Sequence, residues 1–216
     1  MMLQTLRDQT SVLHKEIEKD NTAGLIMDHS ITLEEYKLLL LQNYLAYKVV
    51  EDEIKRFEPE FSTDKSQRLE EDLRTFDIDF KSPLAYFKDY FYCNDSIEAL
   101  GAAYVLEGSA MGGMLIAKEL QHCKNLASIG THHFFNGERK NVQGWKEFMK
   151  KVNSREFSEE ETQKATLKAK ETFRFFGNVI KMRTALRAAR RPCIRGGWAR
   201  SREPGDDIFL FCLFVF

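Results

Sequence analysis

Apolar residues recur with helical spacing along most of the chain. Close to the N-terminus, alternate gaps of three and four residues separate Leu3, Leu6, Thr10, Leu13 and Ile17. Positions with this spacing lie on one side of an α-helix, so the segment predicts an amphipathic helix. Its apolar side is expected to pack on the core of a globular domain.

Residues that start and stop helices divide the rest of the pattern. Thr32 with Glu35, and Ser158 with Glu161, have the spacing of a capping box, which marks the start of a helix. The helix that starts at Thr32 is expected to end at Pro59. Further helices are expected around 69–76, from Ser82-Pro83, from Asn94-Asp95-Ser96, around 145–152 and on to Ile180, with a loop at 130–137.

These segments indicate the fold class. No stretch of residues 1–180 alternates as a β-strand does, and only Pro59 and Pro83 interrupt it. We therefore expect an all-α, single-domain bundle of about seven helices. A chain of 216 residues is long enough to bury a full core as one domain.

The helix expected at Ala102–Leu120 contains three glycines, Gly108, Gly112 and Gly113. Each glycine inside a helix costs about 1 kcal/mol relative to alanine, so the three together cost about 3 kcal/mol. Such a helix is expected to bend or to bring its backbone close to a neighbour. Gly101 lies on the same face as Gly108, which suits close packing against another helix and approach to a flat ligand equally well.

Charge is unevenly distributed along the chain. The net charge is −1 overall, but residues 181–216 carry eight Lys and Arg against three Asp and Glu, a net of +5, which leaves −6 for residues 1–180. The balance argues against a dedicated nucleic-acid binder. Residues 1–180 are therefore interpreted as the folded domain, and 181–216 as an atypical basic and apolar tail. Its composition fits a frameshifted end, an expression-derived sequence or a natural extension.

Several compositional features bear on the cellular compartment. The N-terminus has no apolar core of the kind found in a signal peptide, and no apolar run reaches the roughly 18 residues of a membrane span. The cysteines have no CxxC spacing, so neither a zinc site nor a disulfide framework is predicted. These features favour the cytoplasm and no membrane span.

Of the five histidines, His14 is the strongest candidate for chemistry. No two histidines are four residues apart, and no HExxH or phosphate-binding glycine loop is present. Glu18 lies one helical turn after His14 and can reach its ring, as carboxylates do when they orient a metal-binding histidine. Arg7 lies seven residues before His14, ~10.5 Å along the same side of the helix. A histidine at the core boundary with a surface salt bridge is the alternative interpretation.

Four segments occur in a familiar order: LRDQTSVLHKEIEKD, ALGAAYVLEGSAMGG, THHFFNGERKNVQGWKEFMKKV and AKETFRFFGNVI. Together they resemble the biliverdin-producing heme oxygenase family in its bacterial form, from about Leu3 to Ile180. The resemblance implies a helical bundle that holds heme between the first helix and a kinked, glycine-containing distal helix. The resemblance does not extend to the tail, residues 181–216.

The resemblance also implies roles for individual residues. His14 would be the ligand of the heme iron, and Glu18 would be its hydrogen-bond partner. Arg7 and Lys150 would pair with the heme propionates. Ser109 stands where some members of the family have an aspartate that organises water. The residues expected on the distal side of heme are Gly108, Ser109, Gly112 and Gly113.

The implied activity is the oxidative opening of heme, which is both substrate and cofactor, to biliverdin, carbon monoxide and ferrous iron. Dioxygen and an electron-donating reductase or ferredoxin would be the other partners. Two alternatives remain. One is a non-catalytic heme carrier or sensor on the same fold. The other is a helical interaction module whose glycines only pack helices together.

Overall fold

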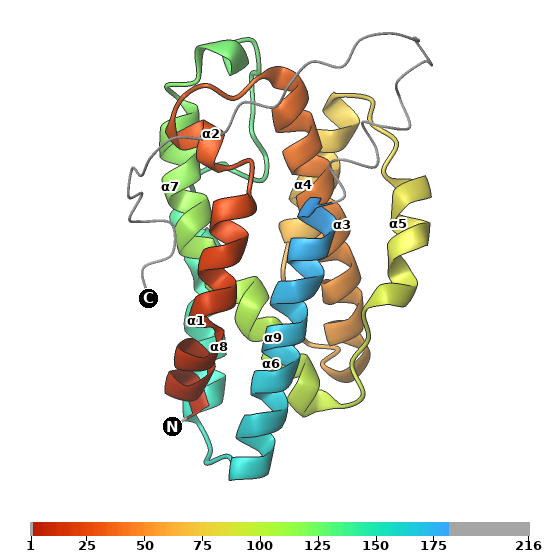
Figure 1. Cartoon of the computed structure of the whole chain (residues 1–216), viewed down its shortest axis with the longest axis vertical. Coiled ribbons are helices and arrows are strands. Elements are labelled where there is room, and N and C mark those ends of the chain that lie inside the picture. The colour runs from red at the N-terminus through yellow and green to blue at the C-terminus, as the bar shows by residue number, and fades with distance from the viewer. Residues whose placement is uncertain (1, 182–216) are drawn as a thin grey trace, which may run out of the picture.

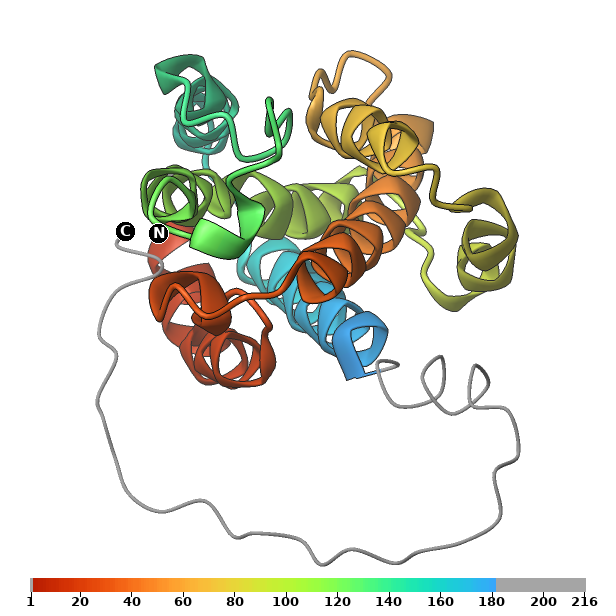
Figure 2. The same cartoon turned by 90° about the horizontal axis from the view of Figure 1, so that it is seen from above.

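The structure, a computed structural model, describes residues 2–181 and is built from helices (Figures 1 and 2). The predicted all-α class is confirmed for these residues. Of the predicted tail, only Lys181 falls among them, so its interpretation lies outside the described residues. The α-helices are α1 (Met2–Asp20), α2 (Gly24–Met27), α3 (Leu33–Phe57), α4 (Lys65–Thr75), α5 (Lys81–Phe87), α6 (Ser96–Gly108), α7 (Ala110–Leu120), α8 (Gln143–Asn153) and α9 (Glu159–Lys181); the 3-10 helices are η1 (Lys88–Tyr90), η2 (Lys124–Leu126) and η3 (Arg139–Val142).

Both predicted capping boxes are present. The Thr32 hydroxyl accepts the Glu35 N–H at 3.2 Å, and the Glu35 carboxylate accepts the Thr32 N–H at 3.1 Å. Ser158 and Glu161 exchange the same pair of hydrogen bonds at 3.1 and 2.9 Å. These contacts satisfy N–H groups that the first turn of a helix leaves without partners.

The start of α5 differs from the prediction. Ser82-Pro83 was expected to begin this helix, but it starts at Lys81. The carboxylate of Asp79 accepts the N–H groups of Lys81 and Ser82 at 3.0 and 3.3 Å. Asp79 therefore supplies the cap that was expected from Ser82, because it stands close enough to reach both donors.

Three helices form the centre of the bundle. Seen from above, α3, α6 and α9 cross one another, with α1, α4, α5 and α8 around them (Figure 2). The residues of α6 from Ala99 to Gly108 are all buried, so this helix has no solvent-facing side. At Gly101, an added Cβ atom would lie 2.1 Å from the carbonyl oxygen of Ala165, so α6 and α9 touch backbone to backbone.

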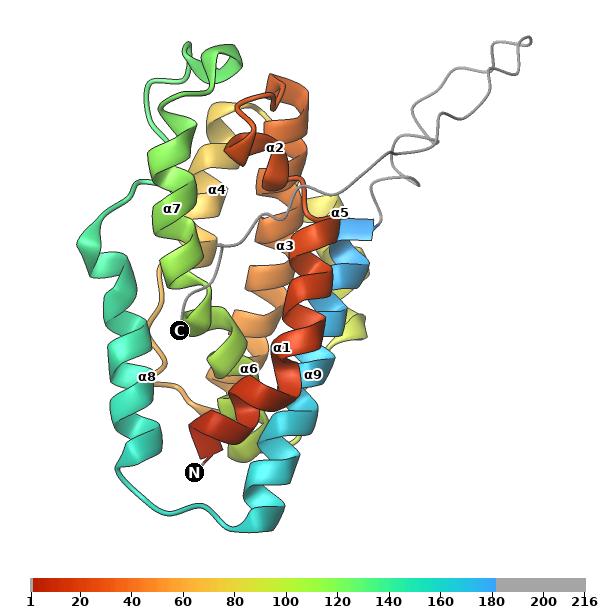
Figure 3. The same cartoon turned by 60° about the vertical axis from the view of Figure 1, so that its left-hand side comes forward.

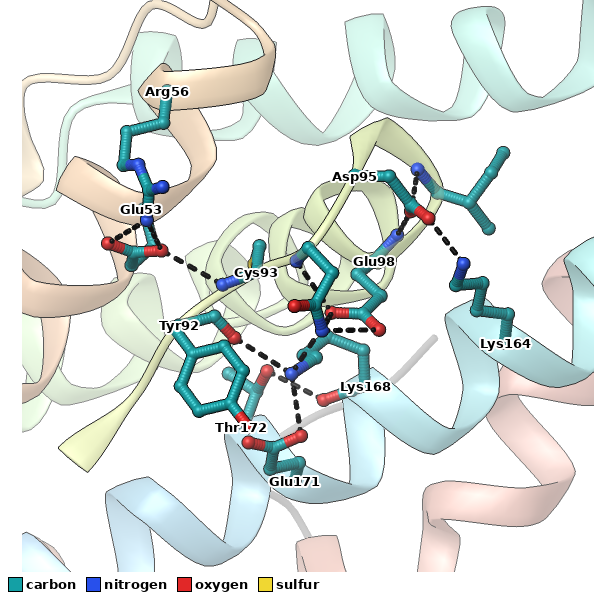
Figure 4. A network of polar contacts seen from close by, with 12 residues as sticks. Glu53, Arg56, Tyr92, Cys93, Asp95, Glu98, Lys164, Lys168, Glu171 and Thr172 are labelled. Carbon is teal, nitrogen blue, oxygen red and sulfur yellow. Dashed lines mark hydrogen bonds and ion pairs between the residues drawn. The ribbon is translucent and has the colours of Figure 1, made fainter.

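A polar network fixes the start of α6 against α9 (Figure 4). Asp95 accepts the N–H groups of Ile97 and Glu98 at 3.0 Å each and forms an ion pair with Lys164. The buried ammonium of Lys168 donates to the carbonyl of Tyr92 at 2.8 Å and pairs with Glu98 at 3.3 Å. Because both lysines belong to α9, they hold this helix in register along α6.

The glycine-containing helix is broken where it was expected to bend. α6 ends at Gly108, and α7 begins at Ala110 in a new direction (Figure 3). At the break, the hydroxyl of Ser109 donates to the carbonyl of Leu106 at 2.7 Å and accepts the hydroxyl of Tyr47 at 2.6 Å. A serine that bonds back to its own helix competes with the backbone ladder and bends the helix.

By length and composition alone, the stretch Ser96–Leu120 could cross a membrane, which sequence analysis did not anticipate. Within the fold, 72% of its most apolar window is buried. This burial is typical of the core helix of a globular bundle.

Candidate functional site

Two adjoining cavities form one cleft between α1 and the α6–α7 break. They share five residues, Glu18, Asn21, Asn43, Tyr47 and Ser109. We call the combined space of the two cavities the cleft. One cavity is completed by His14, Ile17, Tyr104, Val105, Gly108, Phe173, Phe176 and Ile180, and the other by Ala23, Leu39, Gly113, Ile116, Phe134 and Phe135.

His14 reaches the cleft from α1. Its side chain is 15% exposed, and Nδ1 lies 3.5 Å from Oε1 of Glu18, as the spacing in the sequence predicted. The ring of Phe173 stands edge-on to the imidazole at 5.5 Å. Burial lowers the pKa of His14 from 6.5 to about 4, so the imidazole is neutral at neutral pH. A neutral imidazole is the form that binds a metal ion.

Glu18 is the carboxylate beside this histidine. Burial raises the pKa of the Glu18 carboxyl, and the nearby charge of Lys15 opposes the rise. With Nδ1 directed at Glu18, Nε2 is the nitrogen that a metal-ligand role would use.

The wall opposite α1 is formed at the helix break. Gly108, Ser109 and Gly113 line the cleft there, whereas Gly112 is buried but is not one of its lining residues. A Cβ atom added to Gly113 would meet no atom within 4 Å, so this glycine borders open space. Gly101 is different, because it packs against α9. Close packing against another helix therefore occurs at Gly101, whereas Gly113 leaves the space that a flat ligand would need.

A pair of hydroxyl groups lies at the base of this wall. Tyr47 of α3 donates to Ser109, and burial raises the pKa of the Tyr47 hydroxyl. Both residues line both cavities. The phenol is therefore a neutral hydrogen-bond donor held beside the break.

A family model described as heme oxygenase matches residues 1–182. The chain belongs to the heme oxygenase family. It is 32% identical over 84 residues to heme oxygenase PigA of Pseudomonas aeruginosa, a match that covers 39% of this chain and 42% of the relative. The chain thus aligns with less than half of the relative's length.

A solved heme oxygenase has the same architecture. The crystal structure of heme oxygenase-1 from the cyanobacterium Synechocystis, in complex with heme, matches this fold with a TM-score of 0.62 and 17% identity. The match covers 87% of this chain and 95% of the cyanobacterial one. At this identity, the likeness establishes the heme oxygenase fold.

The two basic residues predicted to pair with propionates differ in how close they lie to the cleft. Arg7 is exposed on α1, and its charge lies near the cleft, because it opposes the burial that raises the pKa of Tyr104. Lys150 is exposed on α8 and is not one of the cleft residues. It stands two residues after buried Phe148, about 200° around the helix, so it faces away from the bundle.

Sequence analysis did not assign several of the cleft's residues. Tyr47, Phe134, Phe173 and Phe176 line the cleft, and none of them was among the predicted site residues. For Phe134, the sequence did contain a signal of a ligand site, because two adjacent phenylalanines, Phe134 and Phe135, follow two histidines in a predicted loop. Tyr47 offered none, because its partner Ser109 lies 62 residues away.

The cleft suits a heme oxygenase's ligand better than a bare metal ion. Among residues 2–181, no group of three or more His, Cys, Asp or Glu side chains could hold a metal ion. Heme iron needs as little as one protein ligand, and the neutral imidazole of His14 has the form that such a ligand takes. The open space at Gly113 and the phenylalanines of α9 and the loop match a flat, mostly apolar molecule.

Proposed function

We propose that this chain is a heme oxygenase that opens heme to biliverdin, carbon monoxide and ferrous iron. The observation that carries the proposal is the buried, neutral His14 across the cleft from a helix break lined by Gly108, Ser109 and Gly113. Dioxygen is the second substrate, and a cytoplasmic reductase or ferredoxin supplies the electrons.

On the α1 side, His14 would hold the iron through Nε2, and Glu18 would keep the ring in the required orientation. A neutral histidine ligand, in contrast to a thiolate, does not push electron density toward O–O cleavage. The edge-on ring of Phe173 at 5.5 Å restricts rotation of the imidazole.

On the opposite side, the glycines allow the backbone of α6 and α7 to approach the ligand closely. When bound, heme supplies the redox chemistry with dioxygen, and the protein supplies orientation and hydrogen bonds. Gly108 and Gly113 leave the distal space free of side-chain bulk, and Gly112 is buried beside Gly113 outside the lining. The Tyr47 and Ser109 hydroxyls lie at the helix break and are suited to holding a proton donor or an ordered water there.

At the edge of the cleft, the propionates need cations. Arg7 lies on the cleft side of α1, near Tyr104, and is the first candidate. Lys150 was predicted for the same role, and from the outer face of α8 it would have to reach around that helix.

A heme carrier or sensor is the competing function, and turnover separates it from an enzyme. Purified protein is mixed with hemin, and the visible spectrum is recorded before and after addition of a reductase system under air. We expect a histidine-ligated spectrum that converts to that of biliverdin. A stable heme spectrum under turnover conditions would identify a carrier.

The ligand assignment is tested with His14→Ala. The variant is expected to lose the histidine-ligated spectrum and most turnover. The matched control is His122→Ala, because His122 is exposed beyond the end of α7. An unchanged heme spectrum in His14→Ala would rule out His14 as the ligand.

A further inference from the structure

Helix α4 has a charged face that is buried. Lys65, Arg68 and Asp72 follow one another at gaps of three and four residues, so they share one side of the helix. Their exposed fractions are only 5%, 8% and 2%. Charged side chains are seldom this buried unless they have partners. None of the three belongs to the cleft, but their partners do, or adjoin residues that do.

Asp72 holds the loop after α7. Its Oδ1 accepts the N–H of His133 at 2.8 Å, and its Oδ2 accepts the N–H of Phe134 at 2.9 Å. One carboxylate thus takes two successive backbone donors, and hydrogen bonds to a charged acceptor are the strong ones. The geometry leaves the backbone at Phe134 little freedom.

Arg68 holds the same residue from its other end. Its Nη1 donates to the carbonyl of Phe134 at 3.2 Å and to Oδ1 of Asn141 at 3.0 Å. The guanidinium also lies 5.8 Å from the centre of the Phe134 ring. The N–H, the carbonyl and the ring of Phe134 are therefore all held by one face of α4.

Phe134 in turn borders the cleft. Its ring lies 4.7 Å from that of Phe135 and stands edge-on to Tyr47 at 5.5 Å. Tyr47 is the donor to Ser109 at the helix break. A shift of Phe134 would therefore move the lateral boundary of the cleft next to the distal wall.

Lys65 extends the same arrangement to the break itself. Its ammonium forms a buried ion pair with Glu107 at 2.8 Å, and Glu107 directly precedes Gly108. Glu107 is also enclosed by α8, because a Cβ atom on Gly144 would lie 2.1 Å from its carboxylate. One face of α4 thus fixes two parts of the cleft wall from behind.

We propose that the buried charged face of α4 is a positioning device that fixes how heme is seated in its plane, chiefly through Phe134. A flat ligand between two walls can still turn about its own normal, and this rotation is limited by the lateral boundary together with the partners of the propionates. Asp72 and Arg68 therefore decide which meso carbon lies beside the helix break, and so which biliverdin isomer forms. This inference rests on the proposed function.

The decisive variant is Asp72→Asn, which keeps the shape of the side chain but leaves one backbone N–H without an acceptor. We expect the share of minor biliverdin isomers to change at least threefold and the Kd for heme to rise about tenfold. Isomers are separated by chromatography, and the heme methyl shifts of the ferric complex are compared by NMR. These methyl shifts report the in-plane orientation of the bound heme, and they can be measured without turnover.

Two controls on the same helix separate positioning from stability. Glu71→Gln changes the neighbouring residue, whose carboxylate pairs with the partly exposed ring of His133 at 3.3 Å and accepts the side-chain amide of Gln67 at 3.2 Å, but accepts no backbone N–H of the loop in the described residues. Leu69→Ala removes a fully buried core side chain, and so destabilises α4 without removing a hydrogen bond to the loop. Both are expected to keep the wild-type isomer ratio at temperatures where they are folded.

The outcomes are distinct. An unchanged isomer ratio and unchanged methyl shifts in folded Asp72→Asn would overturn the inference, as would an equal change in Leu69→Ala. If Asp72→Asn fails to fold, Phe134→Leu decides, because it removes the held ring and should shift the same isomers. Absence of heme binding by the wild-type protein would overturn the proposed function, and this inference with it. If the wild-type protein forms biliverdin but Asp72→Asn gives the same isomer ratio, only this inference is overturned.

Discussion

Gly101 and Gly113 allow the two uses of glycine in this fold to be separated by experiment. Each lies inside a helix, so alanine at either position gains about 1 kcal/mol of helix propensity. At Gly113 the new methyl group enters open space, and in the heme-free protein nothing opposes the gain. At Gly101 the methyl carbon would stand 2.1 Å from the Ala165 carbonyl oxygen, so α6 and α9 must move apart.

The two substitutions are expected to change the free energy of unfolding in opposite directions. Overpacking of a tight core contact costs about 1–3 kcal/mol, and the obstacle here is backbone, which yields less easily than a side chain. Gly101→Ala is therefore expected to lose about 1–2 kcal/mol net, and Gly113→Ala to gain about 1 kcal/mol. For a domain of this size, each kcal/mol shifts Tm by about 2–4 °C.

Thermal melts of the heme-free variants, followed by circular dichroism at 222 nm, measure both effects. Heme titrations then add a second comparison, in which Gly113→Ala should bind heme more weakly than the wild type. A Gly101→Ala variant that melts at or above the wild-type temperature would refute the α6–α9 contact. Full heme affinity in Gly113→Ala would remove this glycine from the ligand's wall.

Three further predictions concern His14, Asp95 and Tyr47. Because burial lowers the pKa of His14 to about 4 while the unfolded chain titrates near 6.5, its contribution to stability is complete above pH 6.5 and is lost as the pH falls toward 4. The loss is about 3 kcal/mol, measured as the difference between urea unfolding of the heme-free wild type and of His14→Gln; equal pH dependence in both proteins would contradict it. The Lys164 ion pair and the capped N–H groups lower the pKa of Asp95, so Asp95→Ala should cost about 1 kcal/mol at pH 7 and little once the pH has fallen well below 3.8. Tyr47→Phe should keep heme binding but slow biliverdin formation about tenfold, because one lost hydrogen bond worth about 1.4 kcal/mol in the transition state slows a reaction tenfold; an unchanged rate would exclude the hydroxyl from proton supply.

Local interactions were readable from the sequence. The capping boxes at Thr32 and Ser158 and the His14–Glu18 pair each involve residues three or four apart, so helical geometry alone predicts them. The bend in the glycine-containing helix was also expected. Its location at Ser109 was not, because serine occurs in helices without breaking them, and the second contact of this hydroxyl comes from Tyr47 on a different helix.

Other features of the cleft require the packed fold. Nothing near Asp72 in the chain indicates that its carboxylate will meet backbone groups 61 and 62 residues later. Lys150 shows the reverse case. Its place two residues after an inward-facing Phe148 already indicated the outer side of α8, and the family resemblance outweighed that periodicity.

The break at Ser109 also divides the distal segment into two units of unequal stability. α6 packs against α3, α8 and α9 in the core, whereas α7 contacts mainly the short helices α2 and η3. Local unfolding selects the part with fewer partners, so the amide hydrogens of α7 are expected to exchange with solvent faster than those of α6. We therefore expect that, when a rigid, flat ligand enters the cleft, α7 moves about Ser109 while the close α6–α9 contact at Gly101 is kept.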